Sequence, residues 1–178
     1  MIITVSGKAG SGKSTIARTL AQKLHLKHYS SGDFMREMAK EKGMTLAELS
    51  KLAEQDNGAI DKEIDERQKK LGKTEDDFVI DGRLSAFFIP NAEFKIFLDV
   101  ELDEGAGRIA KDKRATESAE DIKEMKEKIE KREASEVKRY KQYYGFDCYD
   151  KTNYDVLIDT TELTPEQVIG KIVKLVNK

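Results

Sequence analysis

Hydrophobic positions along the chain follow two spacings that alternate from end to end. Short apolar runs cover 2–6, 78–80 and 94–100, and polar or glycine residues follow each of them. The stretch 13–24 instead has apolar residues three and four positions apart, which is the spacing of a helix with one buried face. The chain therefore reads as strands separated by amphipathic helices.

The same patterns give a complete set of expected elements. Strands are predicted over 2–6, 27–29, 78–81, 94–100 and 154–159, and helices over 13–24, 31–38, 59–71, 102–111, 119–144 and 165–176. Thr45 and Glu48 have the spacing of a capping box, which begins a further helix. Polar segment 112–120 is predicted to be an exposed turn. Strands that alternate with helices indicate an α/β protein, with a parallel five-stranded sheet between two layers of helices.

Composition and length limit the classes of protein that remain. The 178 residues suit one domain, 1–178, with one sizeable core. Charged residues make up 37% of the chain but leave a net charge of only −2, so a dominant basic surface for nucleic acid is not expected. No apolar run approaches the ~20 residues of a membrane span, and no charged leader precedes the first strand. These features predict a cytoplasmic, membrane-free protein.

The chain has a single cysteine, Cys148, so an intrachain disulfide is impossible and a reducing compartment is expected. It lies in an aromatic stretch without a neighbouring histidine. We interpret it as a small, semi-buried residue and not as a nucleophile.

A glycine-rich loop lies between the first strand and the first helix. Its sequence fits the pattern G-x-x-x-x-G-K-[ST] and consists of Gly7, Lys8, Ala9, Gly10, Ser11, Gly12, Lys13, Ser14 and Thr15. Glycines allow phosphate oxygens to approach backbone N–H groups, and the helix N-terminus adds partial positive charge. Lys13 would supply a full charge to the β- and γ-phosphates, and the Ser14 hydroxyl would bind Mg²⁺. The motif predicts ATP and Mg²⁺ as cofactors, but kinases, GTPases and other ATPases share it.

Two carboxylates stand at predicted strand ends. Asp81 follows the buried run 78–80, where it is a candidate Mg²⁺ ligand opposite Ser14. The alternative for Asp81 is a residue that only starts the turn at Gly82. Asp33 is a candidate for orienting the metal's water or the acceptor phosphate, and the alternative there is helix capping.

Six arginines stand out by their positions, namely Arg36, Arg67, Arg83, Arg108, Arg132 and Arg139. Transfer of a phosphoryl group between two anions needs preorganised positive charge, and guanidinium binds phosphate bidentately. Arg132 and Arg139 are seven residues apart, so on one helix they share a face at a separation of about 10.5 Å. Taken alone, this pair favours arginines that are solvated or paired with glutamates.

Four segments resemble nucleoside monophosphate kinases, and most closely the short archaeal-type cytidylate kinases. They are Ser31-Gly32-Asp33-x-x-Arg36, Asp81-Gly82-Arg83, 95–99 and 155–161. The resemblance covers nearly the whole chain in order. It implies a P-loop kinase fold with a core (1–30, 73–107 and 145–178), an acceptor-binding region (about 31–72) and a lid (about 108–120). The implied activity is phosphorylation of CMP or dCMP by MgATP.

The resemblance also implies roles for single residues. Ser31, Asp33, Arg36 and Arg83 would bind the acceptor, the two arginines at its phosphate. Arg67 would lie near the base or phosphate of CMP, and Arg108 against ATP. Arg132 and Arg139 would close over the transferred group, and Glu136 would contact the acceptor ribose.

The sequence departs from the bacterial-type enzymes at Leu84, where those enzymes have an acidic residue that helps to read cytosine. Arg67 and Ser85 are our candidates for reading the base here. Gly105 and Gly107, inside a predicted helix, indicate a hinge.

Three alternatives remain open at this point. One is another small P-loop kinase that acts on AMP, UMP, shikimate or dephospho-CoA. A second is a P-loop switch or ATPase, although the chain has no N-K-x-D element. The third is a nucleic-acid-binding module built on 108–141, which the interleaved glutamates disfavour. We expect small-molecule partners only, and a monomer.

Overall fold

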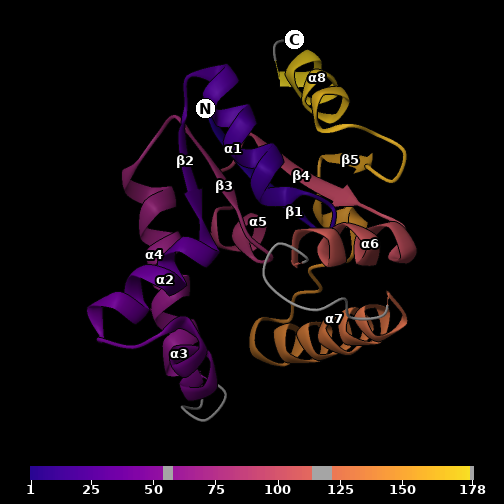
Figure 1. The fold of residues 1–178 in the computed structure, drawn as a ribbon. Helices are drawn as coiled ribbons and strands as arrows, with labels where there is room; N and C mark the ends of the chain where they lie inside the picture. The colour runs from indigo at the N-terminus through magenta and orange to yellow at the C-terminus, as the bar shows by residue number, and fades with distance from the viewer. Residues whose placement is uncertain (54–57, 114–121, 177–178) are drawn as a thin grey trace.

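The computed structural model describes residues 1–53, 58–113 and 122–176 (Figure 1). Within these ranges five parallel strands form one sheet in the order β2-β3-β1-β4-β5, which confirms the predicted architecture. The strands are β1 (Ile2–Gly7), β2 (Lys27–Ser30), β3 (Phe78–Asp81), β4 (Phe94–Asp99) and β5 (Val156–Asp159).

Helices connect the strands at nearly all of the predicted places. They are α1 (Lys13–Leu24), α2 (Ser31–Glu41), α3 (Leu46–Ala53), α4 (Ala59–Thr74), α5 (Ser85–Phe88), α6 (Leu102–Lys113), α7 (Ile122–Tyr144) and α8 (Pro165–Val176). The helix α5 and a 3₁₀ turn at Lys151–Asn153 were not predicted, because such short elements carry no periodic pattern. The capping box before α3 is present, since the Thr45 amide donates to Glu48 at 2.7 Å and the Glu48 amide donates back at 3.2 Å.

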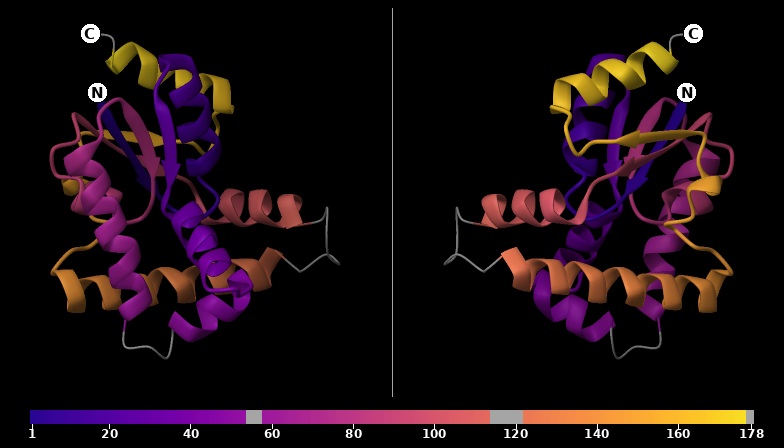
Figure 2. Two further views of the ribbon diagram at one scale, coloured as in Figure 1. Left: turned by 90° about the vertical axis from the view of Figure 1, so that its left-hand side faces the viewer. Right: turned by 90° about the vertical axis from the view of Figure 1, so that its right-hand side faces the viewer.

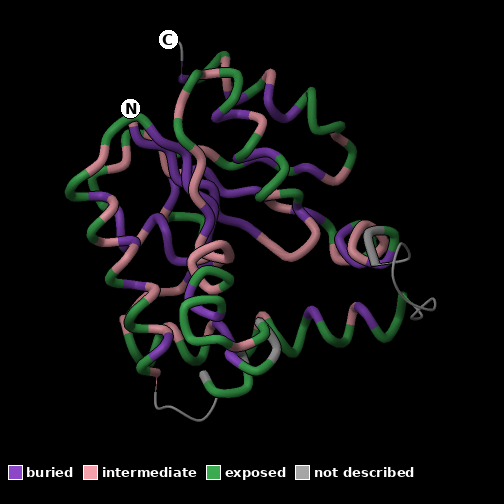
Figure 3. The backbone as a smooth tube through the Cα atoms, turned by 60° about the vertical axis from the view of Figure 1, so that its left-hand side comes forward, coloured by how far each residue is buried: buried purple, intermediate pink, exposed green. Residues whose placement is uncertain are grey.

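The strand residues alternate between two cores on opposite faces of the sheet. Ile3 and Val5 pack with α1 and α8, whereas Ile2 and Ile80 pack on the other face with Ile89. Figure 3 shows the buried backbone concentrated in these strands. Because both faces are covered, the central strands β1 and β3 are buried along their whole length, and this explains their hydrophobic runs.

Two groups of helices extend beyond the sheet. Helices α2, α3 and α4 pack around a small core of their own, with Met38, Leu49 and Ile60 at its centre. Helices α6 and α7 lie side by side (Figure 2) and share the buried residues Ala106 and Ile129. Most of the predicted lid, 114–120, falls outside the described residues.

The carboxyl ends of the strands meet at one edge of the sheet. Asp81 is in register with Ser30 on β2 and with Val5 on β1, and β1 ends at Gly7 beside Leu98. In parallel α/β sheets this edge is where ligands bind. No helix in the described ranges is long and apolar enough to cross a membrane.

Candidate functional site

The loop after β1 has a backbone that only glycine accommodates easily. Gly10 and Gly12 have φ angles of 76° and 83°. A Cβ atom on Gly7 would lie 2.1 Å from the carbonyl oxygen of Leu98. The chain at Gly7 therefore lies directly against β4, and the loop leads from there to the N-terminus of α1 at the sheet edge. The first N–H groups of a helix have no partner within the helix and can bind an anion.

Lys13, the first residue of α1, folds back over this loop. Its ammonium donates a 2.6 Å hydrogen bond to the carbonyl oxygen of Lys8. Burial, together with the nearby charges of Arg83 and Arg132, lowers the pKa of Lys13 to about 7. Three cationic side chains thus converge on the loop, and an anion bound there would relieve their mutual repulsion.

The two predicted metal ligands lie together. The Ser14 hydroxyl donates to Asp81 Oδ2 at 2.8 Å, and Ser30 donates to the same oxygen at 3.1 Å. His28 Nε2 lies 2.8 Å from Asp81 Oδ1, a contact that was not predicted because His28 stands alone in the sequence. A carboxylate and a hydroxyl beside a phosphate-binding loop fit Mg²⁺, which prefers oxygen ligands and takes the rest from phosphates and water.

A buried carboxylate joins two of the predicted arginines. Glu136 on α7 forms an ion pair with Arg83 Nε and accepts hydrogen bonds from Arg132 Nε at 2.9 Å and from the Tyr149 hydroxyl at 2.6 Å. Burial would raise the pKa of Glu136, but Arg83 and its other partners hold it below its usual value. Arg83 also donates to the Gly7 carbonyl at 3.0 Å, so this network adjoins the glycine-rich loop. Both Glu136 oxygens already have partners in the protein. The predicted contact of Glu136 with the acceptor ribose remains a prediction.

A pocket opens between α2, α4, α7 and the end of β3, which we call the acceptor pocket. Its lining consists of Ser31, Gly32, Met35, Asp61, Ile64, Asp65, Gln68, Arg83, Leu84, Arg132, Glu136, Tyr140 and Tyr144. Arg83 and Arg132 interact electrostatically with Lys13, while Asp65 and Gln68 come from the middle of α4 and Tyr144 from the end of α7. The part of the pocket at the arginines is therefore cationic, and the other walls combine apolar and aromatic side chains with Asp61, Asp65 and Gln68.

Asp65 and Gln68 are lining residues that the sequence did not reveal. The only signal was that Gln68 occupies the apolar stripe of its helix, four residues after Ile64 and three before Leu71. Both are buried, at 6% and 3% exposure. The Tyr144 hydroxyl donates to Asp65, and burial raises the pKa of Asp65 to about 6.

Two predicted acceptor ligands lie beside this pocket. Arg36 Nε donates to Asp33 at 3.1 Å, and its guanidinium lies close to Gly32 of the pocket wall. Ser30, not Asp33, provides the side-chain cap of α2, by accepting from the Gly32 amide.

Of the two remaining arginines predicted to contact the acceptor, Arg67 and Arg139, only Arg139 lies near the acceptor pocket. Arg67 pairs with Glu37, Glu41 and Glu63, and it is not among the pocket-lining residues, so the structure does not bring it to the acceptor. Arg139 stacks on Tyr140 at 5.3 Å and lies 3.9 Å from Asp61. It therefore reaches the pocket rim, apart from Arg132.

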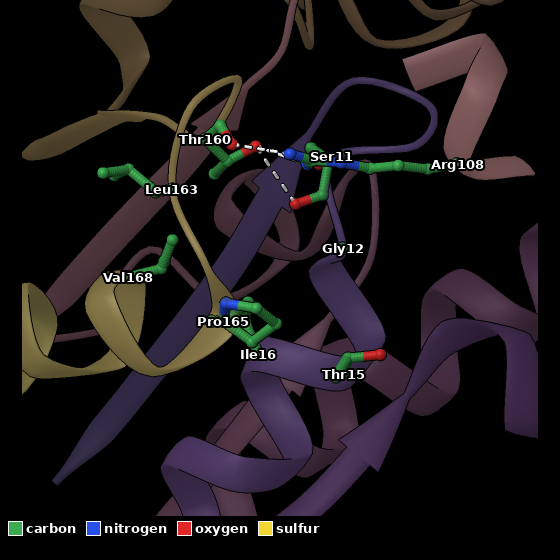
Figure 4. A pocket seen from close by; sticks show the side chains of 9 residues that line it. All are labelled: Ser11, Gly12, Thr15, Ile16, Arg108, Thr160, Leu163, Pro165 and Val168. Atoms are coloured by element: carbon green, nitrogen blue, oxygen red, sulfur yellow. Dashed lines mark hydrogen bonds between the residues drawn. The ribbon is translucent and has the colours of Figure 1, made fainter. Parts of the chain in front are cut away.

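A second pocket lies on the other side of the glycine-rich loop (Figure 4). Arg108 on α6 donates to the carbonyl oxygens of Thr160 at 2.8 Å and Thr161 at 3.1 Å. The remaining lining residues are Ser11, Gly12, Thr15, Ile16, Leu163, Pro165 and Val168. A mostly apolar slot next to a phosphate loop suits a flat base. The loop after β5 that forms its outer wall was not predicted as part of a site.

Gly105 brings α6 into direct contact with the glycine-rich loop. A Cβ atom on Gly105 would lie 2.7 Å from the Ala9 carbonyl oxygen, and one on Gly10 would lie 2.3 Å from the Gly105 carbonyl oxygen. The helix runs through Gly105 and Gly107 without interruption. At Gly105 the physical reason for glycine is close packing, and the hinge at these glycines remains a prediction.

Cys148 is 2% exposed and packs with Leu84 and Phe88. Burial raises the pKa of its thiol to about 12. The interpretation of this residue as a packed side chain is confirmed, and its burial is more complete than expected.

Comparison with known proteins agrees with this geometry. Residues 2–162 match the model of the cytidylate kinase-like family. A protein from Natronomonas pharaonis named cytidylate kinase is 40% identical over 99% of this chain and 90% of its own. Another of that name from Pyrococcus abyssi is 42% identical over 96% of this chain and 90% of its own.

Solved structures show the same fold at low sequence identity. A shikimate kinase from Bacteroides thetaiotaomicron aligns with a TM-score of 0.69 and 16% identity, and the alignment covers 100% of this chain and 99% of that one. This likeness supports the P-loop kinase fold and carries no information on the substrate.

Proposed function

The chain belongs to the cytidylate kinase-like family, and we propose that it transfers the γ-phosphoryl group of MgATP to CMP or dCMP. The observation that carries the proposal is the position of the acceptor pocket. Its cationic end, formed by Arg83 and Arg132, adjoins the glycine-rich loop and acts electrostatically on Lys13. Two anionic nucleotides can therefore meet at one cationic centre.

On the donor side, the loop 7–15 and Lys13 would bind the phosphates of ATP. Ser14 and Asp81 would hold the magnesium ion, which when bound neutralises charge on the phosphate oxygens. The slot beside Arg108 and Thr160 would receive the adenine base, and Arg108 would fix the wall of that slot through the carbonyls that it binds.

On the acceptor side, Arg83 and Arg132 would bind the monophosphate, with Ser31 at the pocket wall. Arg36 and Arg139 are proposed as further phosphate ligands, which requires them to leave Asp33 and Asp61. We retain Asp33 as a positioning group and Glu136 as the holder of the arginines.

The transfer step follows from this placement. An oxygen of the acceptor phosphate attacks the γ-phosphorus in line, a new P–O bond forms, and the bond to the β–γ bridging oxygen breaks to release ADP. The nucleophile is already ionised, so no strong base is needed. Lys13, Arg83 and Arg132 would stabilise the charge that spreads over the transferred group. Closure of the region 31–72 and of the lid over the substrates would exclude water.

An assay of ADP release with a panel of acceptors tests the proposal. CMP, dCMP, UMP, AMP, shikimate and dephospho-CoA would each be offered with MgATP, beside a reaction without acceptor. We expect CMP and dCMP to give the highest kcat/KM. Equal ADP release without any acceptor would instead indicate an ATPase or switch, and a preference for another acceptor would indicate a different kinase.

A further inference from the structure

The wall that α4 contributes to the acceptor pocket holds two buried polar side chains whose hydrogen-bonding capacity is only half used. Asp65 and Gln68 are three residues apart on α4, so they lie on the same face of the helix. Both line the acceptor pocket. Buried polar groups normally have partners, so groups left open toward a pocket indicate a ligand.

Each of the two side chains is oriented by a neighbour on another element. The Tyr144 hydroxyl, from α7, donates to Asp65 Oδ2. The Ser85 hydroxyl, from α5, donates to Gln68 Oε1 at 2.8 Å. In the part of the chain that the structure describes, Asp65 Oδ1 and Gln68 Nε2 have no partner. The neighbours therefore leave one acceptor atom of Asp65 and one donor group of Gln68 unpaired, in two residues that both line the pocket.

We propose that Asp65 and Gln68 read the base of the acceptor nucleotide, with Asp65 Oδ1 accepting from the exocyclic amino group of cytosine and Gln68 Nε2 donating to its ring nitrogen N3. The inference rests on the proposed function. It assigns to Asp65 and Gln68 the recognition of cytosine that the apolar Leu84 cannot provide. Cytosine presents a donor beside an acceptor along this edge. Uracil presents the reverse, so its O4 would face a carboxylate and its N3–H would face an amide N–H.

The surroundings of the pair suit a flat pyrimidine. The pocket walls also include Met35, Ile64, Leu84 and Tyr140, which offer apolar contact to a ring. Adenine carries the same donor–acceptor pair as cytosine, so these two residues separate cytosine from uracil and guanine. Rejection of AMP must come from the space between the walls.

The role of Asp65 can be tested by reversing its hydrogen-bonding character. In Asp65→Asn, the Tyr144 hydroxyl would donate to the amide oxygen, and the amide NH₂ would then face the base. We expect kcat/KM for CMP to fall about 100-fold and kcat/KM for UMP to rise, because a polar site left with mismatched groups rejects its former ligand strongly. Asp61→Asn is the matched control, since it removes another carboxylate of the same pocket and should leave the UMP-to-CMP ratio unchanged.

A second variant covers the case in which Asp65→Asn fails to fold, as judged by its thermal unfolding midpoint. Tyr144→Phe keeps the carboxylate but frees it to rotate, and we expect the preference for CMP over UMP to fall about 10-fold with KM for ATP unchanged. The inference is overturned if either folded variant lowers CMP and UMP turnover by the same factor. Failure of the wild-type protein to phosphorylate CMP would be a separate result, against the proposed function itself.

Discussion

The Ser14 hydroxyl lies 2.8 Å from the Asp81 carboxylate, although the two residues are 67 positions apart in the chain. The contact joins the glycine-rich loop to the end of β3, because β1 and β3 are neighbouring parallel strands that end at the same edge. A hydroxyl and a carboxylate are thereby placed next to the site proposed for the ATP phosphates.

This contact predicts how the enzyme depends on magnesium. Asp81→Asn keeps the shape of the side chain and removes its charge, so we expect the Mg²⁺ concentration for half-maximal activity to rise at least about 10-fold. The measurement is initial rate against Mg²⁺ at fixed ATP. Asp76→Asn, an exposed residue before the opposite end of β3, should behave as wild type. An unchanged Mg²⁺ dependence in Asp81→Asn would remove Asp81 from the metal site.

Lys13 is predicted to be essential for turnover and dispensable for folding. Burial and two guanidinium groups disfavour its charged form in the free protein, so its removal should not lower stability. We expect Lys13→Ala to reduce kcat by roughly 1,000-fold or more while the thermal unfolding midpoint stays the same or rises. Steady-state rates and a melting curve test both parts, and turnover near the wild-type level would refute the assigned role.

Arg83 is predicted to serve the acceptor more than the donor. Arg83→Ala should raise KM for CMP or lower kcat by at least about 100-fold in kcat/KM, with ATP affinity little changed. Arg67→Ala is the control, because Arg67 is held by glutamates away from the pocket and exposed ion pairs contribute about 1 kcal/mol or less. Steady-state kinetics with each substrate varied would separate the two. Loss of ATP binding in Arg83→Ala would place this arginine on the donor side.

Two glycines of α6 form a matched pair for testing the packing of this helix on the loop. Gly105→Ala would force a methyl group to within 2.7 Å of the Ala9 carbonyl oxygen, whereas Gly107→Ala would meet nothing within 4 Å. We expect Gly105→Ala to lower stability and to raise KM for ATP. Gly107→Ala should raise stability by about 0.5–1 kcal/mol, because alanine favours the helix. Urea unfolding of both variants measures the change in stability. Equal changes in the two variants would mean that the close contact between Gly105 and the Ala9 carbonyl does not affect stability.

Asp65 predicts a dependence of stability on pH. Its pKa is raised to about 6 in the folded protein, so the folded state binds this proton more tightly than the unfolded state, and stability contributed by Asp65 falls as pH rises from about 4 to 6. Asp65→Asn removes this penalty. We expect it to raise the free energy of unfolding by about 1–2 kcal/mol at pH 7.5, and the gain should shrink toward pH 4. Urea titrations at several pH values would show a constant difference if the penalty were absent.

The sequence alone was sufficient to predict the sheet, the longer helices around it and the glycine-rich loop. The central strands β1 and β3 are buried on both faces, so their sequences are mainly apolar, and the helices carry a regular apolar stripe. The motif 7–15 is local, and its strand and helix context could be recognised directly. Asp81 and Ser14 could be paired in advance because strand ends of a parallel sheet meet at one edge.

Other parts of the site depend on contacts that no local pattern encodes. Asp65 and Gln68 look like ordinary polar residues of a charged helix until Tyr144 and Ser85 are placed against them. Arg67 was predicted to contact the acceptor, but it pairs with three nearby glutamates and does not line the acceptor pocket. The His28 contact to Asp81 arises from strand register, which the sequence of a four-residue strand does not determine.

The carboxylate of Glu136 has a consequence for the resting enzyme. With this anion already between Arg83 and Arg132, one of the two guanidinium charges of the pocket is balanced within the protein. Inorganic phosphate then gains less free energy on binding, because it must compete with this internal counter-ion. It also has no base that could contact the other walls of the pocket. We therefore expect tight binding only of acceptors that contact both the arginines and the other walls of the pocket.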